Sequence, residues 1–227
     1  MAKAPSPGKV KTRLAPPLTL EESAALNVCF LRDTFTNISE VHNAAGVAVY
    51  TPQGEEAAFH NIVPSNFLML PQRGDNFGER LLAAAQDLLS AGFVACCLID
   101  SDSPTVPHRA LQLAVQALAD PGDRMVLGPT DDGGYYLIGL KHAHAHLFKN
   151  IPWSTSGVFD ATMDRAAEQA LDVTLLPRWF DVDDGPTLKR LVKEMFANDG
   201  KPTEAYAAPH TREFTAKLIQ QKGWTPR

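Results

Sequence analysis

The chain has 227 residues, of which 44% are hydrophobic and 21% charged, and its formal net charge at pH 7 is -5. This length suits one domain with a sizeable core, and the composition is that of a globular protein rather than a disordered or fibrous one. The acidic balance argues against a general nucleic-acid binder, which needs a broad basic face. The longest apolar run, residues 93–99, is only strand-length, so the sequence predicts no membrane span and no membrane partner.

The first thirteen residues form a cationic loop on this acidic chain. No acid precedes Glu21. Prolines and a glycine stiffen the segment, and Lys, Arg and backbone N–H groups are the usual ligands of oxyanions. We therefore interpret it as a phosphate-binding loop, with a solvated and frayed N-terminus as the alternative. Because exposed charges contribute little to stability, Lys11→Ala combined with Arg13→Ala should weaken nucleotide binding and leave the thermal midpoint nearly unchanged. Its cations are Lys3, Lys9, Lys11 and Arg13.

Hydrophobic periodicity and turn residues divide the chain into alternating helices and strands. A capping box at residues 19–22 predicts a helix to about residue 35, and a short polar helix is expected soon after Pro52. Alternating strands and long helices predict right-handed crossovers and a largely parallel sheet with helices on both faces. Ligands bind such sheets beyond the carboxyl ends of the strands. Further helices are predicted at residues 78–89, 107–119, 158–171 and 186–196, and strands at 46–51, 66–70, 93–99, 125–127, 135–140 and 173–176.

The organisation of the chain is simple. We expect one domain over residues 1–199, followed by a polar tail over residues 200–227 with a short amphipathic helix around residues 214–219. The three cysteines have neither metal-ligand nor redox-motif spacing and are interpreted as buried thiols of a cytoplasmic protein. Cys96 and Cys97 are adjacent in a predicted strand, so they should point to opposite faces of the sheet.

Two acidic clusters each follow a predicted strand. Asp100 and Asp102 come directly after residues 93–99, where a carboxylate pair suits Mg²⁺ or Mn²⁺ bridging to phosphate oxygens. An Asx turn before the next helix is the alternative. The second cluster holds Asp181, Asp183 and Asp184, and Asp184 is expected to be the N-cap of the helix that follows.

Two further clusters contain glycines. Residues 130–136 join two predicted strands, and the glycines there allow close backbone approach to a ligand while the tyrosines present a flat face with a polar tip. A Gly-Gly hairpin turn is the competing interpretation. The segment 73–80 ends at Arg80. Its glycines and Arg80 are expected to face a base or phosphate, and an ordinary surface loop is the alternative.

Other catalytic signatures are not found. The sequence has no nucleophile elbow, Walker loop, Gly-x-Gly-x-x-Gly or Cys–His nucleophile pattern, so hydrolase, ATPase and dehydrogenase functions have no support. His142, His144 and His146 alternate at a spacing of two without the carboxylate or cysteine partners of known metal sites, which does not favour metal binding there.

Taken in order, these motifs resemble small bacterial glycosyltransferase-A-like proteins of the arsenosugar-biosynthesis type. That family is similar to the molybdenum-cofactor and phospholactate nucleotidylyltransferases. The resemblance implies an α/β, single-domain nucleotide-diphospho-sugar transferase (GT-A-like) fold with a mostly parallel twisted sheet. It covers about residues 1–195 and is carried by residues 2–14, 101–104, 128–139, 151–154 and 180–183.

The resemblance also implies roles for the clustered residues. Asp102 would be the main ligand of Mg²⁺ or Mn²⁺ and Asp183 would complete the metal site. Lys11 and Arg13 would contact the nucleotide phosphates, and Asp132 with Gly133 and Gly134 would line the acceptor or sugar side. The family usually has glycine where this chain has Asp100, so Asp100 is a metal-ligand candidate from its spacing alone. From the residues themselves we add Lys3, Lys9 and Arg80 as phosphate ligands, Tyr135 on the substrate side and Asp132 as the candidate catalytic base.

The family also has a hydrophobic strand before the residues that match Ala2 and Lys3. We expect its absence from this sequence to be a start-site artefact or a local defect rather than a different fold, with apolar sheet surface left uncovered. Lys3 should then lie at the carboxyl edge of the sheet, near Asp102.

Three functions fit these features. The first is a metal-dependent transferase that binds a nucleotide-diphospho-sugar and passes the sugar to a small acceptor. The second is a nucleotidylyltransferase that joins a nucleoside triphosphate to a phosphorylated small molecule and releases pyrophosphate. The third is a degenerate protein that binds nucleotides without turnover. The sequence leaves the base, the sugar, the acceptor and the oligomeric state open.

Overall fold

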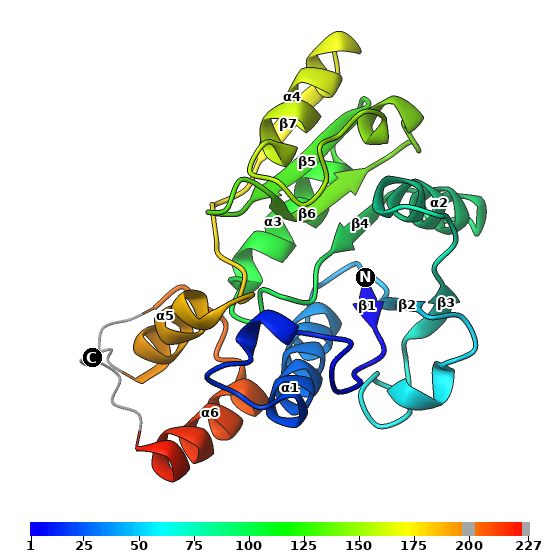
Figure 1. Cartoon of the computed structure of the whole chain (residues 1–227). Helices are drawn as coiled ribbons and strands as arrows, with labels where there is room; N and C mark the ends of the chain where they lie inside the picture. Colours follow the sequence, from blue (N-terminus) through cyan, green and yellow to red (C-terminus); the bar gives the residue numbers. More distant parts are fainter. Residues whose placement is uncertain (197–202, 224–227) are drawn as a thin grey trace.

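The computed structural model describes residues 1–196 and 203–223 (Figure 1). The predicted elements are present, most of them within two or three residues of their expected ends. The strands are β1 (Ala2–Lys3), β2 (Val47–Thr51), β3 (Leu68–Pro71), β4 (Cys96–Ile99), β5 (Arg124–Pro129), β6 (Tyr135–Leu140) and β7 (Asp172–Leu175). The helices are α1 (Leu20–Ser39), α2 (Phe77–Ser90), α3 (His108–Ala119), α4 (Val158–Glu168), α5 (Gly185–Phe196) and α6 (Pro209–Lys222).

The strands form two hydrogen-bonded sheets, in the orders β1-β2-β3 and β4-β6-β5-β7. β2 pairs in parallel with β1 and β3, and β5 pairs in parallel with β7. β6 runs antiparallel to both β4 and β5, so the predicted parallel order has one exception. The connection between β5 and β6 is a hairpin turn, closed by a 3.0 Å bond from the Thr130 amide to the Gly134 carbonyl. The hairpin interpretation of this segment was therefore correct.

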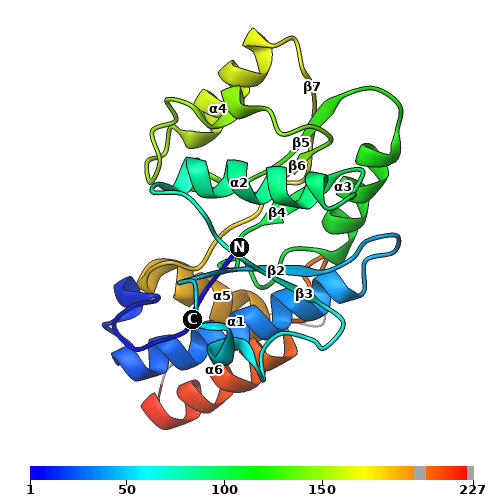
Figure 2. The ribbon, with the colours of Figure 1, turned by 90° about the vertical axis from the view of Figure 1, so that its right-hand side faces the viewer.

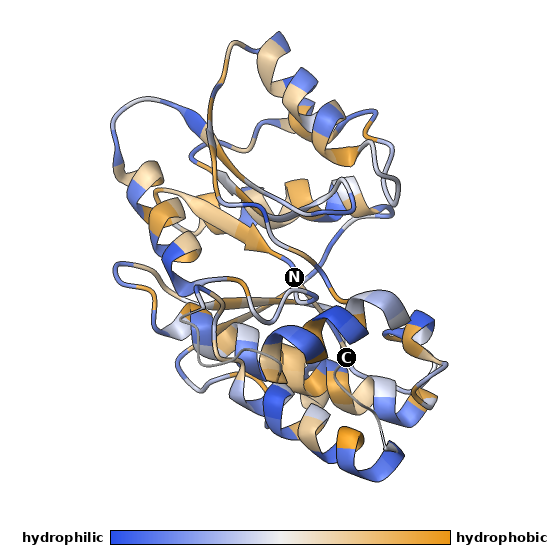
Figure 3. Cartoon of the chain, turned by 90° about the vertical axis from the view of Figure 1, so that its left-hand side faces the viewer, coloured by the Kyte–Doolittle hydropathy of each residue, from blue (hydrophilic) through white to orange (hydrophobic). Residues whose placement is uncertain are grey.

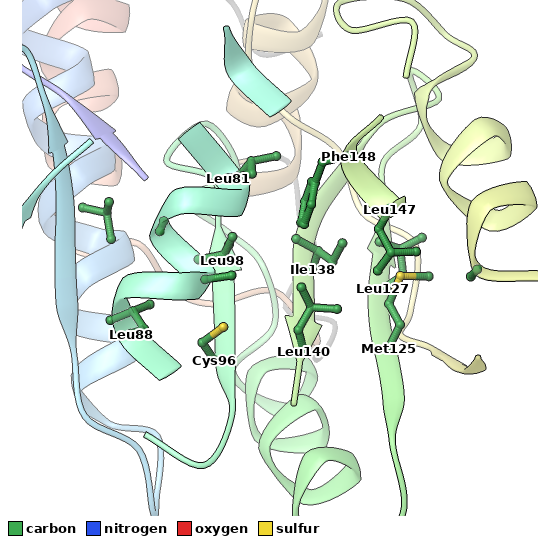
Figure 4. Packing of buried hydrophobic residues seen from close by; sticks show 14 residues of the cluster. Leu81, Leu88, Cys96, Leu98, Met125, Leu127, Ile138, Leu140, Leu147 and Phe148 are labelled. Atoms are coloured by element: carbon green, nitrogen blue, oxygen red, sulfur yellow. The ribbon is translucent and has the colours of Figure 1, made fainter. Parts of the chain in front are cut away.

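Helices cover both faces of the larger sheet, as predicted. On one face α2 packs through Leu81 and Leu88, and α4 contributes Ala166. On the other face α3 packs through Leu111 and Leu118. Figure 4 shows the α2 side chains Leu81 and Leu88 beside β4, while Leu147 and Phe148 lie beside the other two strands. The residues of these strands that share the cluster alternate along each strand, namely Cys96, Leu98, Ile138, Leu140, Met125 and Leu127. Successive side chains of a strand point to opposite faces of the sheet. Because helices cover both faces, each strand carries apolar residues on both sides.

A third group of helices lies beside the smaller sheet, where α1, α5 and α6 gather together (Figures 1 and 2). Their apolar faces share one cluster that includes Leu26 and Phe30 of α1, Leu191 of α5 and Leu218 of α6. Figure 3 shows the matching division of each helix into a polar outer and an apolar inner side. α6 is longer than the helix expected around residues 214–219. Because it packs into this shared core, the described part of the tail is joined to the rest of the protein.

The two sheets meet at β1 and β4 without forming a ladder, and the N-terminus lies at this junction (Figures 1 and 2). One bond crosses it, from the Met1 amine to the Ile99 carbonyl at 2.7 Å. Beside it is a cavity of about 240 Å³, lined mainly by apolar side chains of β2, β4 and α1, Val47, Val49 and Phe35 among them. Burial lowers the pKa of the Met1 amine to about 6. An apolar cavity therefore lies at the junction of the two sheets.

The three cysteines are free thiols, but only Cys96 is buried as predicted, whereas Cys29 and Cys97 are half-buried. Cys96 packs under α2 while Cys97 faces α3, which confirms the prediction that they point to opposite faces. Burial raises the pKa of Cys29 to about 11 and the pKa values of Cys96 and Cys97 to about 12.

These thiols should react slowly with a disulfide reagent. A raised pKa leaves less thiolate, the reactive form, at neutral pH. In a reaction with 5,5′-dithiobis(2-nitrobenzoate) at pH 7.5, the native protein should release thionitrobenzoate at least about ten-fold more slowly than free cysteine. In guanidinium chloride all three should react quickly. Rapid stoichiometric labelling of the native protein would contradict the burial of these side chains.

Among residues 1–196 and 203–223, no helix is both long enough and apolar enough to cross a membrane.

Candidate functional site

The predicted phosphate ligands, together with Asp102 and Asp183, line one cleft of about 340 Å³, here called the carboxyl-edge cleft. It opens where β1, β2, β3 and β4 end, which is the edge at which such sheets bind ligands. Its lining comes from the N-terminal loop, the strand ends, α1, α2 and the segment before α5. The residues are Met1, Ala2, Lys3, Lys9, Val10, Lys11, Thr12, Arg13, Asn27, Thr51, Gln72, Phe77, Arg80, Ser101, Asp102 and Asp183.

The centre of the cleft is an ion cluster around Lys11. The Lys11 ammonium lies 2.8 Å from an oxygen of Asp102 and 2.8 Å from an oxygen of Asp183. It also donates to the Val182 carbonyl at 2.8 Å. Arg13 forms a second ion pair with the other oxygen of Asp183. Asp102 and Asp183 therefore converge, as the sequence predicted, and their shared partner in this structure is a lysine.

A backbone contact explains how residues 81 positions apart in the sequence meet. The Val182 amide donates to the Asp102 carbonyl at 2.8 Å, which ties the loop after β4 to the segment before α5. α5 then starts where expected, because a carboxylate oxygen of Asp184 accepts the Thr187 amide at 2.9 Å. The prediction that Asp184 is an N-cap is confirmed, and this cap leaves Asp183 facing the cleft.

The charges of this cluster stabilise one another. Burial disfavours the charged forms of both Lys11 and Asp183. The carboxylates of Asp102 and Asp183 outweigh that effect and raise the pKa of Lys11 above its ordinary value. For Asp183, burial is likewise outweighed by Lys11 and Arg13, so its pKa is held below the usual range. Lys11 and Asp183 are therefore both charged at neutral pH.

Lys11 differs from the other cations of the loop. Its side chain is only 4% exposed, whereas that of Arg13 is 72% exposed. The expectation that the loop cations are surface charges without effect on stability is therefore wrong for Lys11. Removing Lys11 leaves the two carboxylates without their shared partner, which destabilises the fold, although solvent lowers the cost because Asp102 is 40% and Asp183 31% exposed. Exchange of Lys11 for alanine thus affects folding as well as binding.

The other predicted phosphate ligands border the same cleft. Lys3 ends β1 beside Thr51, so its predicted place near Asp102 is correct. Lys9 is an exposed residue of the loop rim. Arg80 reaches the cleft from α2, with its Nε donating to the Gly74 carbonyl at 3.1 Å. The structure brings these cations to one side of the cleft, and phosphate binding by them stays a prediction.

Asp100 is not part of the cluster around Lys11. Its oxygens accept the Asp102 amide at 3.3 Å and the Ser103 hydroxyl at 2.9 Å, the pattern of an Asx turn. Burial, and then the nearby charge of Asp102, raise the pKa of Asp100 to about 8. The turn interpretation describes Asp100 better than the metal-ligand interpretation, because both oxygens are engaged within the loop.

The hairpin loop holds the predicted acceptor-side residues. An oxygen of Asp132 accepts the Thr130 hydroxyl at 2.6 Å and the Gly134 amide at 2.9 Å, so this carboxylate shapes the turn. Gly133 has φ +91°, and a Cβ there would lie 2.1 Å from the Ser156 carbonyl oxygen. Glycine is therefore required by the turn itself. None of these residues, nor Tyr135, borders the carboxyl-edge cleft directly.

The sequence assigns no role to two residues that the structure places in or near the site, Phe77 in the lining of the cleft and Asp181 outside that lining but near Asp183. Asp181 lies near enough to Asp132 and Asp183 for their charges to add to the effect of burial, and together these raise its pKa to about 6. A carboxylate with such a pKa is suited to exchange protons near neutral pH. Phe77 is 49% exposed at the cleft and stacks edge-on against Trp153, with ring centroids 5.1 Å apart. An aromatic residue between Gly74 and Gly78 in the segment 73–80 was the available sequence signal.

The carboxylates present fit a hard divalent ion that keeps several water ligands. Among the described residues, no three His, Cys, Asp or Glu side chains form a cluster that could enclose a metal. Mg²⁺ is commonly held by one or two carboxylates and the phosphates of a substrate, which matches the pair Asp102 and Asp183. The histidines have separate partners: His144 pairs with Asp123 at 2.8 Å, and His146 pairs with Glu168.

Comparison with known proteins agrees with this arrangement. The family described as "Uncharacterized protein conserved in bacteria (DUF2064)" matches residues 34–155. The crystal structure of a candidate nucleotide-diphospho-sugar transferase from Desulfovibrio desulfuricans G20 is 30% identical in sequence, covers 96% of this chain and 94% of its own, and superposes with a TM-score of 0.81. No curated protein sequence matches the chain.

A more distant structural match shares the fold only. It is a CMP:2-keto-3-deoxy-manno-octonic acid synthetase complexed with CTP, with a TM-score of 0.52 and 10% identity over 71% of this chain and 85% of its own. The architecture is therefore the mixed α/β nucleotide-diphospho-sugar transferase fold that the sequence predicted. The chain belongs to the DUF2064 family of bacterial proteins.

Proposed function

We propose that this protein is a transferase that binds a nucleotide-diphospho-sugar in the carboxyl-edge cleft and passes the sugar to a small acceptor. The observation that carries the proposal is the convergence of the cationic N-terminal loop with Asp102 and Asp183 at the carboxyl edge of this fold. Sugar transfer is further supported by the similarity to the candidate nucleotide-diphospho-sugar transferase, which is 30% identical, and by the motif resemblance to arsenosugar-biosynthesis-type glycosyltransferases.

The residues of the cleft would share the work of stabilising the departing nucleotide diphosphate. A Mg²⁺ or Mn²⁺ ion held by Asp102 and Asp183 would supply Lewis-acid stabilisation of the phosphate charge. Arg13, Lys9 and Lys3 would contact the phosphates, since charge-assisted hydrogen bonds to oxyanions are strong and act where charge develops. Phe77 offers a flat exposed surface on which a base or sugar ring can rest.

Two carboxylates are candidates for the base that accepts the acceptor's proton. Asp132 was the sequence-based choice, but one of its oxygens already holds the hairpin turn. Asp181 has a pKa of about 6, so it is partly protonated at neutral pH and can both take and return a proton. We therefore propose Asp181 as the stronger candidate.

The alternative is nucleotidyl transfer, in which the same cations grip a nucleoside triphosphate and pyrophosphate leaves. The Lys-x-Arg spacing of Lys11 and Arg13, which both line the cleft, favours it. A third possibility is nucleotide binding without turnover.

A thermal-shift panel of nucleotide-sugars and nucleoside triphosphates with Mn²⁺ tests the proposal and separates these alternatives. A ligand at 100 times its dissociation constant adds about 2.7 kcal/mol of stability, an easily measured shift. Release of nucleoside diphosphate from a stabilising nucleotide-sugar, once acceptors are added, would support sugar transfer. Pyrophosphate release would support nucleotidyl transfer, and stabilisation without either product would support a binding protein.

Matched variants place the ligand in the cleft. Arg13→Ala removes an exposed cation of the loop, and Lys149→Ala removes an exposed cation outside the cleft. The first should reduce the shift caused by the nucleotide, while the second should not. Equal shifts in both variants would contradict binding at this cleft.

A further inference from the structure

We propose that Lys11 is an internal cation that occupies the divalent-metal position of the cleft when no nucleotide is bound, so that Lys11 opposes metal binding. This inference rests on the metal part of the proposed function, because it assigns to Asp102 and Asp183 both a metal ion and a lysine as alternative partners. It concerns the order in which ligands can enter the cleft rather than the reaction itself.

The first support is the position of the ammonium group. It lies 2.8 Å from one oxygen each of Asp102 and Asp183, so it sits between the two carboxylates that would hold an ion. An ammonium has three N–H donors, and here their acceptors are those two oxygens and the Val182 carbonyl. The group is thus fully bonded in this place.

The second support is that Lys11 is held there firmly. Its side chain is 4% exposed, and the ring of Phe30 lies 5.6 Å from the ammonium. Its backbone is left-handed, with φ 48° and ψ 36°, a conformation that a non-glycine residue adopts only when surrounding contacts compensate for it.

The third support is the charge balance. Asp102 and Asp183 carry two negative charges, and Lys11 and Arg13 carry two positive charges. Adding a divalent cation to this balanced group would place it beside a buried like charge, which is costly. If the Lys11 ammonium left its place between Asp102 and Asp183, both carboxylates would be free to bind the divalent ion. The phosphates of a nucleotide in the cleft would give the departing ammonium new acceptors, so metal and nucleotide binding would be coupled.

A titration with Mn²⁺ alone tests the inference, since it requires no nucleotide and no activity. Free Mn²⁺ is measured by its electron paramagnetic resonance signal in the presence of the wild-type protein and of Lys11→Met, which keeps most of the side-chain volume. The variant should bind one Mn²⁺ at least about ten-fold more tightly than the wild type, a difference of about 1.4 kcal/mol.

Two further variants make the result specific. Arg13→Met removes the other cation that pairs with Asp183. Because the Arg13 side chain is exposed and does not lie between the two carboxylates, this variant should bind Mn²⁺ within about three-fold of the wild-type affinity. Lys11→Met combined with Asp183→Asn should lose the gain in Mn²⁺ affinity, because one of the two carboxylate ligands is gone. Lys11→Gln, which keeps a hydrogen-bond donor, provides a second neutral variant if Lys11→Met does not fold.

The outcomes are distinct from those of the nucleotide panel. Equal Mn²⁺ affinity in the wild type and both neutral variants, or binding by none of them, would overturn the inference even if nucleotide-sugar turnover were found. A gain that survives Asp183→Asn would also overturn it, since the ion would then lie elsewhere. A gain in both neutral variants supports it even if no sugar transfer is detected.

Discussion

Replacing Asp183 or Asp102 by asparagine should weaken Mn²⁺-dependent nucleotide binding by at least about ten-fold, whereas Asp100→Asn should change it by less than about three-fold. The two carboxylates meet at one point, because the same Lys11 nitrogen lies 2.8 Å from each. Each replacement removes a full negative charge from the position of the ion while the size of the side chain is kept. Oxygen ligands of this kind favour Mg²⁺ or Mn²⁺ over Zn²⁺.

Asp100 is the matched control for this experiment. It is two residues from Asp102, but its oxygens bond to the Asp102 amide and the Ser103 hydroxyl within the loop. Binding should be measured by isothermal titration at fixed Mn²⁺, with the thermal midpoint of each variant recorded to separate misfolding from ligand loss. Negligible losses in both Asp102→Asn and Asp183→Asn, or a loss in Asp100→Asn as large as theirs, would end the metal assignment.

The second large effect concerns stability. Asp33→Ala should lower the free energy of unfolding by about 2–4 kcal/mol, because it removes both acceptors from the first turn of α6. Asp33 is 0% exposed on α1, and its oxygens accept the His210 amide at 3.0 Å and the Thr211 amide at 2.7 Å. Without them, two helix N–H groups at this contact lose their acceptors, and the contact between α1 and α6 is weakened.

Urea unfolding provides the measurement, with Asn76→Ala as the control. Asn76 is the N-cap of α2, and its side chain also accepts a helix amide, that of Glu79 at 3.0 Å, but at an exposed position. Water can replace that cap, so the control should lose only about 1 kcal/mol. If Asp33→Ala were no more destabilising than Asn76→Ala, the buried cap would not be what fastens α6 to the protein.

The elements of the fold were largely readable from the sequence because their signals are local. The capping box of α1 is present as predicted, with the Thr19 hydroxyl accepting the Glu22 amide at 3.1 Å. The period of apolar residues marked α2, α3 and α5, since burial of one helical face repeats every three to four residues. The antiparallel direction of β6 could not be predicted from the sequence, because a short apolar run indicates a strand but not the direction in which it runs relative to its neighbours.

The site was predicted only in part. The cations of the N-terminal loop and the acids after β4 stood out by composition, and their meeting at the carboxyl edge followed from parallel topology. Asp181 gave no separate signal, because its raised pKa arises from burial and from the charges of Asp132 and Asp183. The different roles of neighbouring acids in each cluster depend on hydrogen bonds that the spacing of residues does not specify.

The sequence by itself determined the fold class, the positions of most elements and the edge of the sheet where the charged residues gather. These properties depend on interactions between residues close in the chain, or on topological rules that hold for all parallel sheets. Only the tertiary structure decided that Lys11 is buried between Asp102 and Asp183 while Arg13 remains exposed. That difference arises because the Val182 amide binds the Asp102 carbonyl and closes two distant loops around one side chain, a contact that no local pattern encodes.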